Sequence, residues 1–209
     1  ATGSGRTPDP ALFDAGELRS LYALDRRAFW LAVAVALGVL LLGVLPGVLL
    51  GVVLSLARVL IEVARPRDAL LGRLPTDRRF HDLAGDEGGA TTPGVLVYRL
   101  YAPLIFANAR HVAGRLRALE AAAQPPLRCL VLDLQAVTQI DVTALAQLRD
   151  LYEDLEARGV DVRFPRVNRP LREQLVQWLG DHRFGTERFF PSASAAVDDF
   201  LASRGPARG

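Results

Sequence analysis

A long apolar run dominates the first third of the chain. Residues 28–57 contain no Asp, Glu, Lys or Arg, and roughly 20 apolar residues are enough for a helix to cross a bilayer. A helix of this length in a soluble core would carry a polar stripe on its solvent side, and this run has none. The pattern therefore predicts membrane-embedded helix rather than a buried helix of a soluble protein.

Two short spans suit this run better than one. A single helix of its length would measure about 45 Å, against a hydrocarbon core of roughly 30 Å. Pro46-Gly47 lies near the middle, so the predicted hairpin has helices over residues 28–45 and 47–64. Arginines flank both outer ends, at positions 26, 27, 58, 65 and 67, and the positive-inside rule then keeps both ends in the cytoplasm. A single kinked span is the alternative.

The remaining boundaries follow from composition. Residues 1–27 are polar and mixed, with a candidate short surface helix over 11–24. Residues 65–93 are rich in turn formers and are predicted to be a linker. Residues 94–203 form the second predicted domain, and 204–209 a disordered tail. Because periodic elements begin only at Gly94, the fragment 94–209 is expected to fold on its own.

Strand-like and helix-like segments alternate from Gly94 onward. Strands are predicted at 94–100, 103–106, 127–134, 160–164 and 189–190. Helices are predicted at 108–123, 144–158, 169–179 and 195–201, with Asn108 and either Ser192 or Ser194 as caps. This order predicts an α/β domain with a mixed or parallel sheet flanked by helices, preceded by an all-α transmembrane hairpin.

Composition narrows the function. All 25 basic residues are arginines and the net charge is +2, so neither a P-loop lysine nor strong attraction to nucleic acid is expected. Cys129 is the one cysteine, and His81, His111 and His182 show no ligand spacing, so no metal or other cofactor is expected. No catalytic constellation stands out, and the chain is not expected to be an enzyme.

Three motifs of the second domain stand in a recognisable order: GVLVYRLYAPLIFANA at 94–109, LVLDL at 130–134 and IDVTAL at 140–145. Together they resemble a STAS domain, the sulfate transporter and anti-sigma factor antagonist domain. The upstream segment 25–56, with its central Leu-Pro-Gly, resembles the last two membrane helices of SulP anion transporters, the sulfate permease family. The resemblance covers roughly residues 20–203.

This resemblance implies the C-terminal portion of a secondary anion transporter at the inner or plasma membrane, with the STAS domain as a cytoplasmic regulatory or interaction module. The implied partners are the bilayer and the rest of the membrane core. A homodimer and a cytoplasmic regulatory protein are further candidates, and nucleic acid is not. The substrate-binding residues would lie in the larger core that precedes this segment in the family. The alternative is a membrane-anchored stand-alone STAS protein of the anti-sigma factor antagonist type, acting in partner-switching signalling.

The loop after the central strand carries the candidate regulatory residues. In anti-sigma factor antagonists the matching motif is Asp-x-Ser/Thr-Gly, whose hydroxyl residue is phosphorylated. Asp141 and Thr143 match it here, while Ala144 replaces the glycine. A structural role is favoured over phosphorylation, with Thr143 as a helix N-cap and Asp141 near the positive end of the helix. Asp133, at the end of the central strand, suits loop hydrogen bonding better than an anion site.

Overall fold

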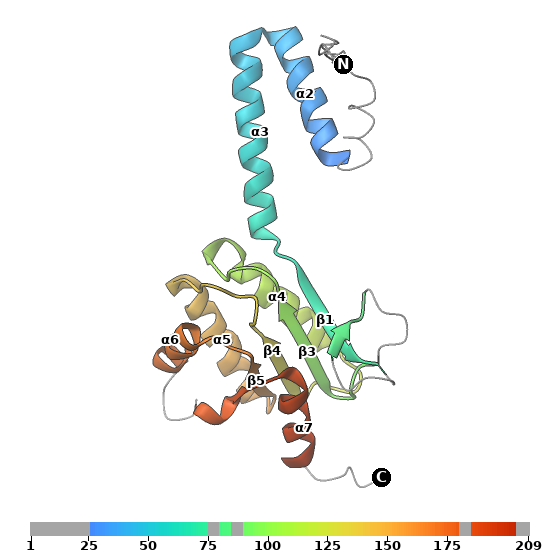
Figure 1. Ribbon diagram of the computed structural model, residues 1–209, viewed down its shortest axis with the longest axis vertical. Coiled ribbons are helices and arrows are strands. Elements are labelled where there is room, and N and C mark those ends of the chain that lie inside the picture. Colours follow the sequence, from blue (N-terminus) through green and yellow to red (C-terminus); the bar gives the residue numbers. More distant parts are fainter. Residues whose placement is uncertain (1–25, 75–79, 85–89, 180–184, 204–209) are drawn as a thin grey trace, which may run out of the picture. The chain divides into compact units, whose positions relative to one another are not determined.

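The computed structural model describes residues 26–74, 80–84, 90–179 and 185–203 (Figure 1). The chain divides into two compact units, Ala1–Glu62 and Val63–Gly209. The candidate surface helix over 11–24, nearly all of the polar N-terminal segment, and the predicted tail 204–209 lie outside the described residues.

Two helices make up the described part of the first unit. Helix α2 covers Arg26–Leu42 and helix α3 covers Val44–Ala64, with Gly43 between them at φ 92°. Glycine adopts this left-handed conformation without a Cβ clash, so the chain turns at Gly43. The break predicted at Pro46-Gly47 is therefore displaced, because both of those residues lie within α3.

Pro46 fits inside α3 because of where it falls. It is the third residue of the helix, and the first backbone N–H groups of any helix have no intrahelical acceptor. A proline at this position loses no hydrogen bond, whereas one in the helix interior would. The expected helix breaker is thus a residue of the first turn.

Glycines let α2 and α3 approach each other closely. A Cβ built on Gly47 would lie 2.5 Å from the Cα of Val39, which is too close for any side chain. A Cβ on Gly51 would lie 3.2 Å from the side chain of Val35 and 3.8 Å from its Cβ. Small residues at such positions are what allow membrane helices to pack backbone against backbone.

Among the described helices, only α3 is both long and apolar enough to cross a bilayer. It has 21 residues, and only 6 % of its most apolar stretch is buried. The apolar part of α2, Ala28–Leu42, is shorter. A helix that is mostly apolar and yet largely exposed suits lipid rather than a protein core.

The second unit is built on a sheet whose described strands number six, in the order β2-β1-β3-β4-β5-β6. Strands β3 to β6 run parallel, whereas β1 pairs antiparallel with both β2 and β3. The strands are β1 (Asp68–Arg73), β2 (Phe80–Asp82), β3 (Val95–Leu100), β4 (Cys129–Asp133), β5 (Asp161–Pro165) and β6 (Phe189–Phe190). The predicted α/β class with a mixed sheet is confirmed.

Helices cover both faces of the sheet (Figure 1). On one face lie α4 (Phe106–Ala122), α5 (Val142–Ala157) and α6 (Arg169–Leu179), and on the other lies α7 (Ala193–Ser203), which follows the short 3₁₀ helix η1 (Thr186–Arg188). Successive strand side chains point to opposite faces, so Leu130 and Leu132 join the first core while Cys129 and Val131 join the second. Every residue of β4 is buried, as its unbroken apolar pattern predicted.

Two segments differ from their sequence prediction. Residues 65–93, predicted to be a linker, contain β1 and β2, and Leu71 of β1 is 2 % exposed. The short apolar run of β1 is stabilised by pairing with β3, a partner that no local pattern reveals. Residues 103–106, predicted as a strand, make a single bridge between Leu104 and Ile140 before α4 begins at Phe106.

A buried arginine fastens α7 to the sheet. The Arg163 guanidinium donates to Asp161 at 2.8 Å, to Asp199 at 2.5 Å and to the Ala196 carbonyl at 2.9 Å. It also lies over the ring of Phe200, at 5.4 Å. Burial by itself would lower the pKa of Arg163, but the hydrogen bonds to the two carboxylates outweigh it and the net direction is upward. The charge is therefore kept, and it is neutralised where it is buried.

We expect a disulfide to form within the hairpin when Val35→Cys and Gly51→Cys are combined. The 3.8 Å between the two Cβ positions matches the separation found in natural disulfides. Oxidation in detergent, followed by gel mobility and mass spectrometry, detects the link. The pair Val35→Cys with Val53→Cys is the control, because Val53 is exposed and lies on another side of α3. If Val35→Cys combined with Gly51→Cys formed no disulfide, the result would favour a single straight span over the hairpin.

We expect the fragment 65–209 to be more stable than 94–209, although the sequence pattern began the domain at Gly94. Removing β1 uncovers the edge of β3 and deletes the buried side chains of Ala69 and Leu71. The loss should be roughly 2–5 kcal/mol, as for large-to-small changes in a core. Urea unfolding followed by circular dichroism measures it. Equal midpoints and slopes for the two fragments would contradict this expectation.

Candidate regulatory site

The loop that holds Asp141 is fixed by backbone bonds to the segment before α4. Leu104 donates its N–H to the Gln139 carbonyl at 3.0 Å, and Asp141 donates its own to the Leu104 carbonyl at 3.2 Å. These bonds extend the parallel pairing of β3 and β4 beyond the strand ends, through the bridge between Leu104 and Ile140. As a result, α4 and α5 begin next to each other at the carboxyl end of the parallel strands.

The Asp141 carboxylate serves both helix starts. Its Oδ1 accepts the N–H of Ala144 at 2.8 Å, which makes Asp141 the N-cap of α5. Its Oδ2 accepts the N–H of Phe106, the first residue of α4, at 2.7 Å. The first N–H groups of a helix need outside acceptors, and a negative charge is favoured at that end. The Asp141 side chain therefore provides an acceptor for one N–H group at the start of each of the two helices.

Thr143 does not cap the helix. It is the second residue of α5, two residues after the Asp141 cap, and it is exposed. The structural role considered for Thr143 as N-cap is thus corrected, because the longer reach and charge of Asp141 occupy that position. Thr143 is therefore a surface residue of the first turn of α5.

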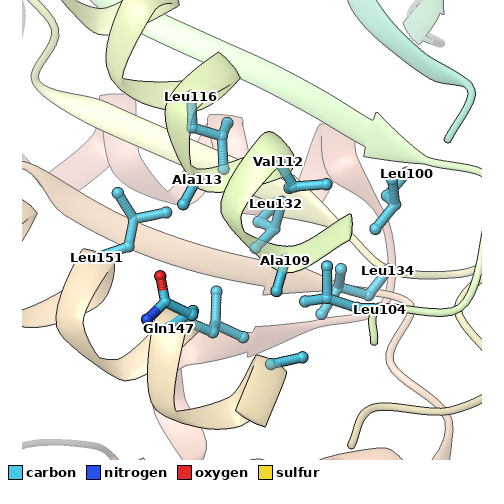
Figure 2. A pocket seen from close by; sticks show the side chains of 12 residues that line it. Leu100, Leu104, Ala109, Val112, Ala113, Leu116, Leu132, Leu134, Gln147 and Leu151 are labelled. Atoms are coloured by element: carbon cyan, nitrogen blue, oxygen red, sulfur yellow. The ribbon is translucent and has the colours of Figure 1, made fainter. Parts of the chain in front are cut away.

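Ala144, which stands where antagonists carry glycine, packs inward. Its side chain is fully buried and helps to line a small apolar cavity of about 10 Å³ between the sheet and helices α4 and α5. Figure 2 shows the cavity enclosed mainly by leucine, valine and alanine side chains, with Gln147 at its border. A space of this size holds about one water molecule and is far below that of a ligand pocket. The Ala144 methyl group therefore belongs to core packing and leaves the outer surface of the loop unchanged.

Asp133 is held in a structural ion pair. It is fully buried, and its Oδ2 accepts Nε and Nη2 of Arg99 at 3.0 and 2.8 Å. Its Oδ1 accepts the N–H of Gln135 at 3.0 Å. Burial alone would lower the pKa of Arg99, but the hydrogen bond to Asp133 outweighs it and raises it. Both carboxylate oxygens are in use, so Asp133 serves the loop and not an anion site.

Asn108 has a role that its sequence position did not reveal. Predicted to begin α4, it is instead the third residue, and its Oδ1 accepts the N–H of Ile105 at 2.9 Å. Its amide donates to the carbonyls of Pro103 at 2.9 Å and Val63 at 3.2 Å. Asn108 is 2 % exposed, so this amide ties the start of α4 to the last turn of α3 inside the second unit. The sequence could not predict this role, because one of the three partners of Asn108, Val63, is distant in the chain.

The other candidate ligands are not gathered into a site. His81 lies in β2 and His111 in α4, while His182 falls outside the described residues. Within the described ranges, no group of three or more His, Cys, Asp or Glu side chains could hold a metal ion. Cys129 is fully buried in β4, as its strand pattern predicted.

Comparison with known proteins covers both units. The family model of the STAS domain matches residues 90–196, about half of the chain. A probable sulfate transporter of Mycobacterium tuberculosis is 37 % identical over 191 residues, covering 90 % of this chain and 34 % of its own length. The low affinity sulfate transporter 3 of Stylosanthes hamata is 30 % identical over 205 residues, covering 93 % of this chain and 32 % of its own length. The chain thus spans about a third of the length of these relatives.

A solved structure of a larger protein contains the same fold as this chain. The murine Solute Carrier 26 family member A9 anion transporter, in its inward-facing state, superimposes with a TM-score of 0.73 at 20 % identity. The match covers 90 % of this chain and 31 % of that one. The likeness therefore extends over the apolar helices as well as the α/β domain, in two sequence relatives and in the fold of a solved structure. The chain belongs to the STAS domain family, and its sequence is similar to sulfate transporters over both of its units.

Proposed function

We propose that this chain is the C-terminal portion of a secondary transporter for sulfate or a similar anion, with the STAS domain as its cytoplasmic regulatory module. The observation that carries the proposal is the extent of the likeness. Alignments with sulfate transporters run through 90 % or more of the chain, so they include the apolar helices as well as the domain. The partners that the proposal requires are the bilayer and the rest of the membrane core.

The charges around the hairpin support a cytoplasmic STAS domain. Arg26 begins α2, while Arg58, Arg65 and Arg67 lie in or just after the last part of α3. Arginines concentrate on the cytoplasmic side of membrane segments. With a turn at Gly43, both ends of the hairpin reach the same side of the membrane. The domain that follows α3 would then be cytoplasmic.

The exposed start of α5 is the proposed point of regulation. Thr143 is accessible, lies two residues after Asp141, and sits at the positive end of a helix. A phosphate at such a position is favoured by the helix dipole and by nearby backbone N–H groups. The loop could therefore accept a charge without losing its fold, while its outer surface changes from neutral to strongly negative.

A membrane-anchored stand-alone STAS protein is the less supported function. A soluble signalling antagonist needs no uncovered apolar helix of 21 residues. The relatives that align through that helix are named as sulfate transporters. For these reasons the transporter portion is the function we propose.

We expect Asp141→Ala to destabilise the domain by about 1–3 kcal/mol, because it removes one helix cap and leaves the N–H of Phe106 without its acceptor. Thr143→Ala should change the free energy of unfolding by less than about 0.5 kcal/mol, since Thr143 caps nothing. Denaturant unfolding of the fragment 65–209 measures both. A larger loss for Thr143→Ala than for Asp141→Ala would contradict the assigned roles.

We expect the full-length protein that contains this chain to take up radiolabelled sulfate in proteoliposomes, and Thr143→Glu to change the uptake rate without lowering the melting temperature. Thr138→Glu is the matched control, because Thr138 is exposed in the same loop but lies outside the helix start. Absence of uptake of sulfate and other small anions would contradict the transporter function. If uptake is normal and neither Thr143→Glu nor Thr138→Glu changes its rate, only the regulatory role of Thr143 is contradicted.

A further inference from the structure

Three apolar side chains stand exposed at one end of the domain. Phe106, Val142 and Tyr101 are 71 %, 62 % and 44 % exposed. Phe106 and Val142 flank the same carboxylate, because Asp141 accepts the N–H of Phe106 and directly precedes Val142. Two large apolar residues are thus held side by side in solvent by a rigid cap, a placement that hydrophobic burial alone would not select.

Three exposed arginines belong to the same end of the domain. Arg65 and Arg67 precede β1, and Arg166 follows β5, where its guanidinium donates to Gln135 at 2.6 Å. None of the three forms an ion pair with a carboxylate of the described residues. Asp68, the acid next to Arg67, pairs instead with Arg115. Among the described residues at this end of the domain, three exposed arginines thus have no carboxylate ion-pair partner, while the Asp141 carboxylate is engaged by two helix N–H groups.

Strand topology brings the six residues to one place. The carboxyl ends of β3, β4 and β5 lie at the same edge because these strands are parallel. Strand β1 is antiparallel to β3, and its first residue, Asp68, pairs with Leu100 at the end of β3. Residues just before β1 and just after β3, β4 and β5 consequently gather together. We call this surface the basic-apolar patch: Arg65, Arg67, Tyr101, Phe106, Val142 and Arg166.

The patch lies where the membrane helix ends. The Val63 carbonyl in the last turn of α3 accepts the amide of Asn108, two residues after Phe106, and the Arg67 carbonyl accepts the N–H of Tyr101. With 21 residues, α3 measures about 31 Å, which equals the hydrocarbon thickness of a bilayer. Under the proposed function α3 crosses the bilayer, so Val63 comes to the membrane surface and the patch comes with it.

We propose that the basic-apolar patch docks on the anionic lipid surface next to α3, with its apolar side chains among the headgroups and its arginines on lipid phosphates. Aromatic residues beside arginines are the combination that membrane interfaces favour. Each arginine near an anionic surface contributes about 1 kcal/mol. The inference rests on the proposed membrane insertion of α3, and it adds a second attachment of the domain to the bilayer.

Docking also gives a physical reason for charge sensitivity at Thr143. Its side chain is exposed directly after Val142, within the apolar part of the patch. A phosphate there would meet anionic headgroups of the same sign and oppose the contact, as in other electrostatic membrane switches.

Single-tryptophan variants of the full chain in lipid nanodiscs test this docking. Phe106→Trp is placed in a background of Trp30→Phe and Trp178→Phe, and its fluorescence is compared in anionic phosphatidylglycerol-containing discs and in pure phosphatidylcholine discs, each with lipids brominated near the headgroup. We expect quenching at position 106 in the anionic discs. Arg67→Gln should lower the ratio of docked to undocked chains about fivefold, from the loss of about 1 kcal/mol. Arg128→Gln, which removes an exposed arginine at the opposite end of β4, should leave it unchanged.

The two native tryptophans separate the outcomes. A chain that keeps only Trp30, in α2, reports membrane insertion, and one that keeps only Trp178, in α6, reports a face outside the patch. Quenching of Trp30 without quenching at position 106 would overturn the docking and leave membrane insertion standing. If the emission of the tryptophan at position 106 shifts to the blue but the brominated lipids do not quench it, protein covers this side chain. That result would also overturn the docking on lipid. An unquenched Trp30 would overturn insertion and docking together.

Discussion

The Asp141 carboxylate is the contact on which the functional end of this domain depends. Two helices that follow adjacent parallel strands must start beside each other, and each brings backbone N–H groups with no acceptor of their own. Asp141 accepts one from each, at 2.7 and 2.8 Å. With the cap taken by an acid on the inside of the loop, the next residues, Val142 and Thr143, are turned outward. The exposure of this loop is therefore a consequence of its rigidity.

Charge is distributed unequally over the domain. Where arginines are buried they meet carboxylates, as Arg99 meets Asp133 and Arg163 meets Asp199. An unpaired charge in those positions would cost far more than a paired one. Where the parallel strands end, Arg65, Arg67 and Arg166 are exposed and form no ion pair with a carboxylate of the described residues, and Tyr101, Phe106 and Val142 are exposed at the same end. Pairing thus keeps the buried charges neutralised within the domain, while the exposed arginines remain available on its surface.

Several elements could be predicted from the local sequence pattern. The elements that were missed or misplaced have identifiable physical reasons. The strands β3, β4 and β5 were found because buried parallel strands are nearly continuous in apolar residues. Strand β1 was missed because its few apolar residues sit between charges and its stability comes from pairing with β3. The turn of the hairpin was expected at Pro46-Gly47, yet proline in a first turn is harmless and Gly43 alone has the left-handed backbone.

The candidate site was found from its motif, but the roles within it were not. A sequence can show that Asp141 and Thr143 are spaced for a cap and an exposed hydroxyl, and it cannot show which residue does which. The bond of Asp141 to the N–H of Ala144 decides the cap of α5, and its second bond, to the N–H of Phe106, joins residues 35 positions apart. Asn108 is a similar case, since its amide is satisfied by Val63, 45 positions earlier.

The sequence by itself determined the apolar helices, the α/β class, the family and the position of the candidate regulatory loop, because each rests on periodicity or on a contiguous motif. Only the tertiary structure decided that β1 completes the sheet, that Asp141 also accepts the N–H of Phe106, and that the amide of Asn108 reaches the Val63 carbonyl. These features depend on hydrogen bonds and strand pairings between residues distant in the chain. Such contacts leave no local pattern, since their stability is realised only when the strands are side by side.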